Sequence, residues 1–141
     1  MLTANATLLL SLPDSYGAPL AEYYYLPEHA ELYVRWHGQL TAAEVIAGVK
    51  EASQWRGQLA IERILNDKRD TGGDWSEALP WLQYEWLPQA VAAGVRAMAY
   101  ILSSDIEAKW VSQEFVEAVR PKLNVALFTT ENEAQRWLEQ R

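Results

Sequence analysis

Three aspartates stand close together in the polar segment Asp67-Lys68-Arg69-Asp70-Thr71-Gly72-Gly73-Asp74. Carboxylates at such short spacing can gather a hard cation, because Ca²⁺ and Mg²⁺ prefer oxygen ligands. The spacing does not follow the EF-hand pattern, and Lys68 and Arg69 are placed to neutralise the aspartates locally. The triplet Asp70-Thr71-Gly72 also occurs in aspartic proteases, where it lies in a dry apolar site, whereas residues 66–69 here are all polar. We therefore expect neither a metal site nor an aspartic dyad in this segment.

The residue types of nucleophilic catalysis are present, but not in a recognised arrangement. The chain has no cysteine, which excludes thiolate nucleophiles, disulfides and cysteine-bound metals. A Ser-His-Asp set could be written from Ser103, His37 and Asp105, but no Gly-x-Ser-x-Gly elbow supports it. His29 and His37 are not spaced as metal ligands, and neither a Walker A loop nor a Gly-x-Gly-x-x-Gly motif occurs. The sequence predicts no catalytic residues, no metal and no cofactor, so we expect a protein that is not an enzyme.

Charge and hydrophobicity exclude further classes. The net charge is −7 and no run of lysine or arginine forms a basic patch, which disfavours binding to nucleic acid or to an anionic membrane surface. No segment approaches the roughly 20 apolar residues of a membrane span. The run Leu8-Leu9-Leu10 is too short for a signal peptide and lacks a basic region before it. We therefore expect a cytoplasmic protein without stable membrane insertion.

The hydrophobic pattern predicts an α/β fold with a mixed β-sheet. Residues 1–20 look like an N-terminal arm, in which residues 8–12 could pair as an edge strand, and residues 21–141 form a single domain. Two aromatic runs separated by a turn predict an antiparallel hairpin, and capping boxes at Thr41, Ser104 and Thr130 mark three helix starts. Helices and mostly parallel strands alternate after the hairpin. The expected strands cover residues 22–26, 32–36, 60–66, 96–102 and 123–128, with residues 67–74 as a loop.

The segment 75–94 carries the strongest indication of an apolar pocket. Proline cannot be accommodated in a regular helix interior, so Pro88 predicts a break or kink, and Gly94 is a typical residue after a helix end. A broken helix cannot close tightly on a sheet. The seven tryptophans either fill the core or line a groove for a ligand or partner, and both alternatives stay open here. The candidate pocket residues are Trp75, Leu79, Leu82, Trp86 and Trp110.

Polar residues follow the carboxyl ends of the predicted parallel strands. Ligands collect outside these ends in open α/β sheets, and two of the loops open helices whose free N–H groups favour anions. The alternative is that the serines and threonines only cap helices. The candidate binding residues are Asn66, Asp67, Arg69, Asp70, Gly72, Gly73, Ser103, Ser104 and Asp105, with Thr129 and Thr130 at a third loop.

Over residues 21–141 the chain resembles the SpoIIAA-like (STAS) fold, and more specifically a divergent, uncharacterised bacterial branch grouped with Sec14-type lipid-binding domains. The residues that carry the resemblance are Asn66-Asp67-x-Arg69, Trp75, Trp81-Leu82, Glu85-Trp86-x-Pro88 and Ala93-Gly94. Classical members carry an Asp-Ser-Ser-Gly motif whose first serine is phosphorylated by a partner kinase. Here Asp70-Thr71-Gly72-Gly73 is similar, which makes Thr71 the candidate phosphoacceptor at a helix start, although Gly72 replaces the second serine and Asp74 an apolar residue.

The resemblance and the missing catalytic sets predict a non-enzymatic regulatory or protein-interaction domain. We expect a protein partner or self-association as a dimer, because the aromatic content exceeds what a small core requires. The alternative function is binding of a small apolar, lipid-like molecule, as the Sec14-type relatives imply.

Overall fold

The computed structural model describes residues 5–141 of the chain. The elements are, in order, β1 (Thr7–Pro13), β2 (Pro19–Leu26), a 3-10 turn (Pro27–His29), β3 (Glu31–Gln39), α1 (Ala42–Gln54), a 3-10 turn (Trp55–Gly57), β4 (Arg63–Gly72), a 3-10 turn (Ser76–Ala78), α2 (Leu79–Trp81), a π-helical turn (Leu82–Trp86), α3 (Leu87–Ala92), β5 (Ala97–Ile101), α4 (Ile106–Val119), β6 (Asn124–Phe128) and α5 (Glu131–Glu139).

The strands form one sheet in the order β1-β2-β3-β4-β5-β6. The pairs β1–β2 and β2–β3 are antiparallel, and the pairs β3–β4, β4–β5 and β5–β6 are parallel. The predicted mixed sheet with an antiparallel hairpin and later parallel strands is confirmed. Within the expected arm, β1 forms the edge strand that Leu8–Leu12 favoured, while residues 1–4 of that arm lie outside the described residues.

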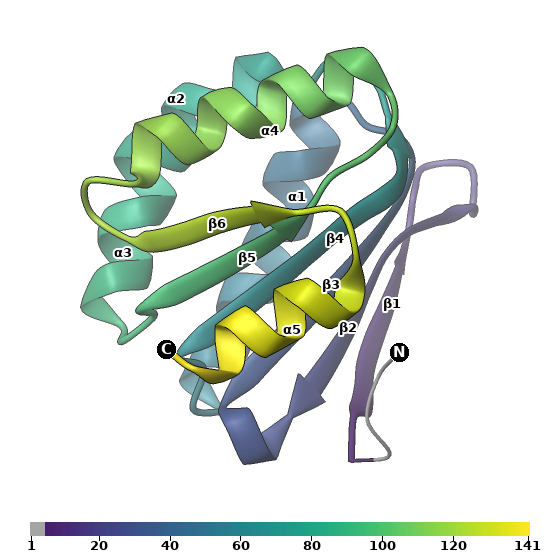
Figure 1. Cartoon of the computed structure of the whole chain (residues 1–141). Helices are drawn as coiled ribbons and strands as arrows, with labels where there is room; N and C mark the ends of the chain where they lie inside the picture. Colours follow the sequence, from purple (N-terminus) through teal and green to yellow (C-terminus); the bar gives the residue numbers. More distant parts are fainter. Residues whose placement is uncertain (1–4) are drawn as a thin grey trace.

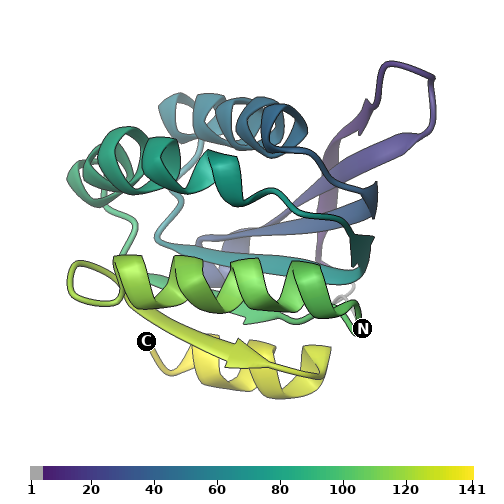
Figure 2. The ribbon, with the colours of Figure 1, turned by 90° about the horizontal axis from the view of Figure 1, so that it is seen from above.

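Helices cover both faces of the sheet (Figures 1 and 2). One face carries α1, the helical segment 76–92 and α4, and this side holds the larger apolar core, which includes Trp36, Trp75, Trp86 and Phe115. The other face carries α5, beneath which a smaller apolar cluster contains Leu65, Ile101 and Leu138. The strands β2 to β6 therefore send alternate side chains into two separate cores.

The predicted helix starts are correct in position but differ in detail at α4. Thr41 and Glu44 form the predicted capping box at α1, and the Thr130 hydroxyl accepts a hydrogen bond from the Glu133 N–H at α5. At α4 the cap is Asp105, which accepts a bond from the Ala108 N–H, so the capping box expected at Ser104 was wrong. An aspartate is as good an N-cap as a serine, so the pattern alone could not separate the neighbouring positions.

The strand β4 is longer than its apolar residues indicate. Residues 67–72 were expected to form a loop, yet they continue the strand to Gly72 because β3 also extends and pairs His37 with Asp70 and Gln39 with Gly72. The pairing shifts by one residue between Arg35 and His37, as in a β-bulge. A strand held by a neighbouring strand needs no apolar alternation of its own, so the loop prediction failed here.

The helical segment 76–92 does not break at Pro88, contrary to expectation. The Pro88 nitrogen has no hydrogen to donate to the Tyr84 carbonyl, and the turn that contains Tyr84 is the π-helical turn. The widened turn therefore replaces the predicted kink. Gly94 has a φ of 104°, which confirms it as the residue that ends the segment.

A carboxylic acid is buried at the start of β3, on the face covered by α5. Glu31 accepts a hydrogen bond from the Gln135 amide at 2.6 Å, and its Oε2 has no partner among the described residues. Burial raises the pKa of Glu31 to about 7. The hydrogen bond from Gln135 and the positive charge of Arg63 oppose this rise, whereas the negative charges of Glu139 and Glu131 add to it. The folded protein therefore favours the neutral acid.

We expect Glu31→Gln to remove a pH dependence of stability. Between 4.5, the ordinary pKa, and about 7, the unfolded chain loses the Glu31 proton while the folded chain keeps it, so wild-type stability falls as pH rises through this window. The loss amounts to about 3 kcal/mol. Urea unfolding across the window should show a smaller fall for Glu31→Gln, while Glu114→Gln, at an exposed site on α4, should follow the wild type. Identical pH dependence in wild type and Glu31→Gln would contradict this.

Candidate functional site

A lysine lies fully inside the larger core. Lys68 is on β4 and its residue is only 1 % exposed. Its Nζ lies 3.7 Å from the ring centre of Trp75, 5.0 Å from that of Trp36 and 5.3 Å from that of Tyr100. Among the described residues, 5–141, no hydrogen bond or ion pair reaches this amino group. A buried lysine without a carboxylate partner is rare in proteins, so Lys68 is the centre of the candidate site.

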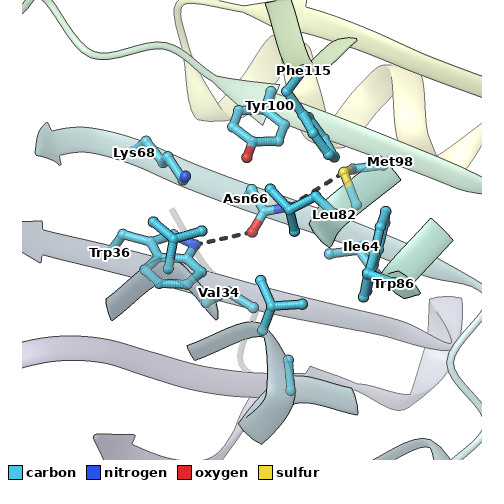
Figure 3. Close-up of a pocket in the computed structure, with 13 residues that line it drawn as sticks. Val34, Trp36, Ile64, Asn66, Lys68, Leu82, Trp86, Met98, Tyr100 and Phe115 are labelled. Carbon is cyan, nitrogen blue, oxygen red and sulfur yellow. Dashed lines mark hydrogen bonds between the residues drawn. The ribbon is translucent and has the colours of Figure 1, made fainter. Parts of the chain in front are cut away.

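Lys68 Nζ points into a small cavity between the sheet and the helices (Figure 3). The cavity has a volume of about 30 Å³, and residues of β3, β4 and β5 form its floor. Leu82 and Trp86 of the π-helical turn and Phe115 of α4 form part of its wall. Of the residues predicted to line an apolar pocket, Leu82 and Trp86 line this cavity, and a ligand pocket there stays a prediction.

The polar groups of the cavity fall into two sets. Asn66, on the floor, accepts a hydrogen bond from the Trp36 indole N–H at 3.0 Å through its side-chain oxygen, and its amide nitrogen donates to the Met98 sulfur at 3.4 Å. The Tyr100 hydroxyl has no hydrogen bond from the described residues, and neither has the buried Trp75 indole N–H. The unpaired groups near Lys68 are thus donors or, for Tyr100, a hydroxyl that can both donate and accept.

The alternation of β4 explains why Lys68 has no counter-ion. Asp67 points to the opposite face of the sheet, where its carboxylate accepts hydrogen bonds from the Tyr33 hydroxyl and from Arg69 Nε at 3.0 Å. Asp70 pairs with Arg35 at 2.5 Å. Lys68 was expected to help neutralise these aspartates; this was wrong, because alternation directs Asp67 to the opposite face and Asp70 is paired with Arg35 instead.

The protonation of the site follows from burial. Burial holds the pKa of Lys68 well below its ordinary value of 10.5, and burial raises the pKa of Tyr100. Both shifts favour the neutral form of the group, because a charge in an apolar cavity lacks the solvation that water provides. Burial in the cavity therefore disfavours the charged forms of both groups.

The predicted binding loops do converge at the carboxyl edge of the sheet. The Ser103 hydroxyl donates to the Thr71 carbonyl and accepts from the Asp105 N–H, which ties the end of β4 to the start of α4. Arg69 contacts Glu131 at the start of α5 at 2.9 Å. The end of β4 therefore lies beside both later loops, as the strand order requires.

Comparison with known proteins identifies the family. The family model described as SpoIIAA-like matches residues 32–139. The chain belongs to the SpoIIAA-like family. In its fold it is similar to the anti-sigma factor antagonist SpoIIAA in its unphosphorylated form, at 16 % identity and a TM-score of 0.53, over 96 % of this chain and 97 % of that one. An uncharacterized DUF3478 protein with a SpoIIAA-like fold from Shewanella loihica matches at 16 % identity and a TM-score of 0.48, over 94 % and 91 %. Among curated proteins none matches.

The SpoIIAA-like motif of the sequence ends a strand rather than starting a helix. Thr71, the candidate phosphoacceptor, lies in β4, and its buried hydroxyl donates to the Lys68 carbonyl at 2.8 Å. Gly73 has a φ of 92°, and a Cβ there would approach the Leu40 carbonyl oxygen to 2.7 Å. The expectation that Thr71 opens a helix was wrong. Its phosphorylation stays a prediction, and a kinase would first have to displace this end of β4.

The remaining candidate residues are distributed as follows. Trp75, Leu82 and Trp86 are buried and Leu79 is partly buried, as predicted for the inner face of the segment. Trp110 was expected in the pocket, but it lies on the outer face of α4, because the buried positions of this helix include 108, 111 and 115. His37 contacts Glu22 and Ser103 contacts Thr71, so the contacts of these two residues do not form the triad considered from the sequence.

Sequence reasoning missed Lys68 and Tyr100. The signal was available in the spacing, because Ile64, Asn66 and Lys68 occupy alternate positions and must share one face if the strand continues.

Within the described range, no helix is both long and apolar enough to cross a membrane. Nor do three or more His, Asp or Glu side chains of residues 5–141 gather as a metal site.

Proposed function

We propose that this chain is a non-enzymatic regulatory domain that acts by binding a protein partner. The fold is shared with SpoIIAA, an anti-sigma factor antagonist, and therefore a protein that acts on another regulatory protein. The observation that carries the proposal is an exposed apolar pair on α4. Ile106 is 78 % exposed and Trp110 is 69 % exposed, and residues four positions apart lie on the same side of a helix.

The surroundings of this pair favour a basic partner surface. Glu107, Glu114 and Glu117 lie three, four and seven positions from Trp110 on α4, and Trp110, Glu114 and Glu117 line the same shallow surface hollow. Tryptophan is enriched among the residues that dominate binding energy at protein interfaces. The proposed partner therefore offers an apolar hollow for Trp110 with basic side chains around it. The pair also stands at the edge where the β4 and β5 loops meet.

The double variant Ile106→Ser with Trp110→Ser tests this face. Both side chains are exposed, so we expect little change in stability but at least about a tenfold loss of partner affinity, since an interface tryptophan contributes more than 1 kcal/mol. Quantitative cross-linking and affinity capture from cells of the source organism should recover a protein with the wild type and with Tyr16→Ser, but not with the double variant. Tyr16 is the matched control, because it is exposed and distant, in the turn between β1 and β2.

Sedimentation equilibrium separates the two kinds of partner. A wild-type dimer that dissociates in the double variant would assign this face to self-association. If the wild type and the double variant are both monomeric and recover the same proteins in equal amounts, the proposal that this face of α4 binds a partner is wrong.

The second candidate function is binding of a small lipid-like molecule. The observation in its favour is that a π-helical turn forms part of the wall of the apolar cavity, and such turns are frequent at functional sites. The cavity must enlarge well beyond 30 Å³ to take an acyl chain. Native mass spectrometry of the protein purified from its source should then show a retained lipid mass, and protein free of any such mass would count against this function.

A further inference from the structure

The cavity at Lys68 is built almost entirely from hydrogen-bond donors and apolar walls. Its one amide, Asn66, is used by Trp36 and Met98. The Lys68 amine and the Tyr100 hydroxyl line the cavity and receive no hydrogen bond from the described residues. Buried polar groups in folded proteins are almost always paired, so this arrangement indicates an occupant with acceptor atoms.

The missing acceptor is anionic in character. The nearby carboxylates of Asp67 and Asp70 are already paired with Arg69 and Arg35, and alternation directs Asp67 to the other face of the sheet. A carboxylate entering the cavity would meet an amine that can take up a proton from solution and so become its counter-ion. Charge-assisted hydrogen bonds of this kind are about twice as strong as neutral ones.

The size of the cavity limits the occupant. A volume of 30 Å³ corresponds to about two water positions, at roughly 10–15 Å³ each, which is the space taken by the two oxygens of one carboxylate. The apolar walls, including Val34, Leu82 and Phe115, must move apart to admit the hydrocarbon group of a ligand, and they offer no partner for a second charge.

We propose that the cavity between β4 and the π-helical turn is a binding site for a small monocarboxylate, held by the Lys68 amine and the Tyr100 hydroxyl. The apolar part of the ligand lies against Leu82 and Trp86, and entry requires movement of the π-helical turn. This site is separate from the α4 face and does not depend on the protein-partner proposal. The lowered pKa of Lys68 means that binding takes up a proton from solution.

Acetate, propionate and butyrate are the probes, with acetamide and propionamide as neutral matches and chloride as the ionic-strength control. Thermal unfolding of the wild type should shift upward with a carboxylate, since a ligand at ten times its Kd raises the folded-to-unfolded ratio about elevenfold. Lys68→Met should lose at least about tenfold in affinity, the size of one charged hydrogen bond. Lys109→Met, at an exposed lysine on α4, should behave as the wild type.

Calorimetry provides a readout that a structural role would not change. Titration in two buffers of different ionisation enthalpy, at several pH values below 10.5, should show net proton uptake on carboxylate binding by the wild type. Tyr100→Phe should weaken binding but keep the proton uptake. The proposal is wrong if wild type and Lys68→Met respond equally. It is also wrong if the carboxylates raise the thermal unfolding midpoint of the wild type only at concentrations that also raise that of Lys68→Met. The cavity would then hold only water.

Discussion

Replacing Lys68 by methionine is expected to raise the free energy of unfolding and to remove a pH dependence on the alkaline side. The pH window of this effect runs from the lowered pKa of Lys68 in the folded chain up to its ordinary pKa of 10.5. Within this window the Lys68 amine is neutral in the folded chain and protonated in the unfolded chain. The unfolded chain binds the extra proton, so stability rises with pH across this window. The slope is about 1.4 kcal/mol per pH unit.

Methionine matches the length of the lysine stem and fits the aromatic surroundings of Nζ. Urea unfolding at several pH values should therefore show Lys68→Met more stable than wild type at neutral pH, by more than the roughly 1 kcal/mol typical of a substitution. The two proteins should converge as pH approaches 10.5. Lys109→Met supplies the control and should retain the wild-type slope. A variant less stable than wild type at every pH would show that the amine stabilises the fold.

The second large effect is expected at Asp67. Its carboxylate is fully buried and accepts hydrogen bonds from Tyr33 and Arg69, while Arg69 also contacts Glu131. Asp67→Ala leaves the Tyr33 O–H without its acceptor and the Arg69 charge without its main partner. The Arg69 side chain is 37 % exposed and keeps Glu131, so the expected cost is that of a lost buried hydrogen-bond partner, about 1–3 kcal/mol, and urea unfolding at neutral pH should show a loss of that size.

Asp70→Ala is the matched comparison. Asp70 also pairs with an arginine on a neighbouring strand, but its side chain is 45 % exposed and that of Arg35 is 37 % exposed. Exposed pairs contribute about 0–1 kcal/mol, so this variant should unfold near the wild type. Equal losses at the two positions would mean that the burial of Asp67 does not determine its contribution.

The mixed sheet with its antiparallel hairpin and most helix starts could be predicted from the sequence because local signals agreed with the hydrophobic pattern. The capping box at Thr41, the aromatic hairpin and Gly94 each depend on interactions between near neighbours in the chain. The extension of β4 depends on β3, a partner about 30 residues away, and no local signal in residues 67–72 reveals it.

The candidate site was predicted only in part for the same reason. Trp75, Leu82 and Trp86 follow helical spacing, so their burial was foreseeable. Lys68 stands between two charged residues in a polar run, and its burial follows only once β4 is known to continue. Trp110 was misplaced because a large aromatic residue on an amphipathic helix was assigned to its inner face, whereas the helix leaves it exposed.

The opposite orientations of Asp67 and Lys68 also bear on how the chain avoids misfolding. A slip of β4 by one position would exchange the two faces. Asp67 and Arg69, which share one face of β4, would then both face the larger apolar core, and Lys68 would leave it. Placing this ion pair among the tryptophan rings costs several kcal/mol per ion. The charged residues at positions 67 and 69 thus penalise the nearest mispaired sheet, at the strand through which the hairpin and the later β-α units are joined.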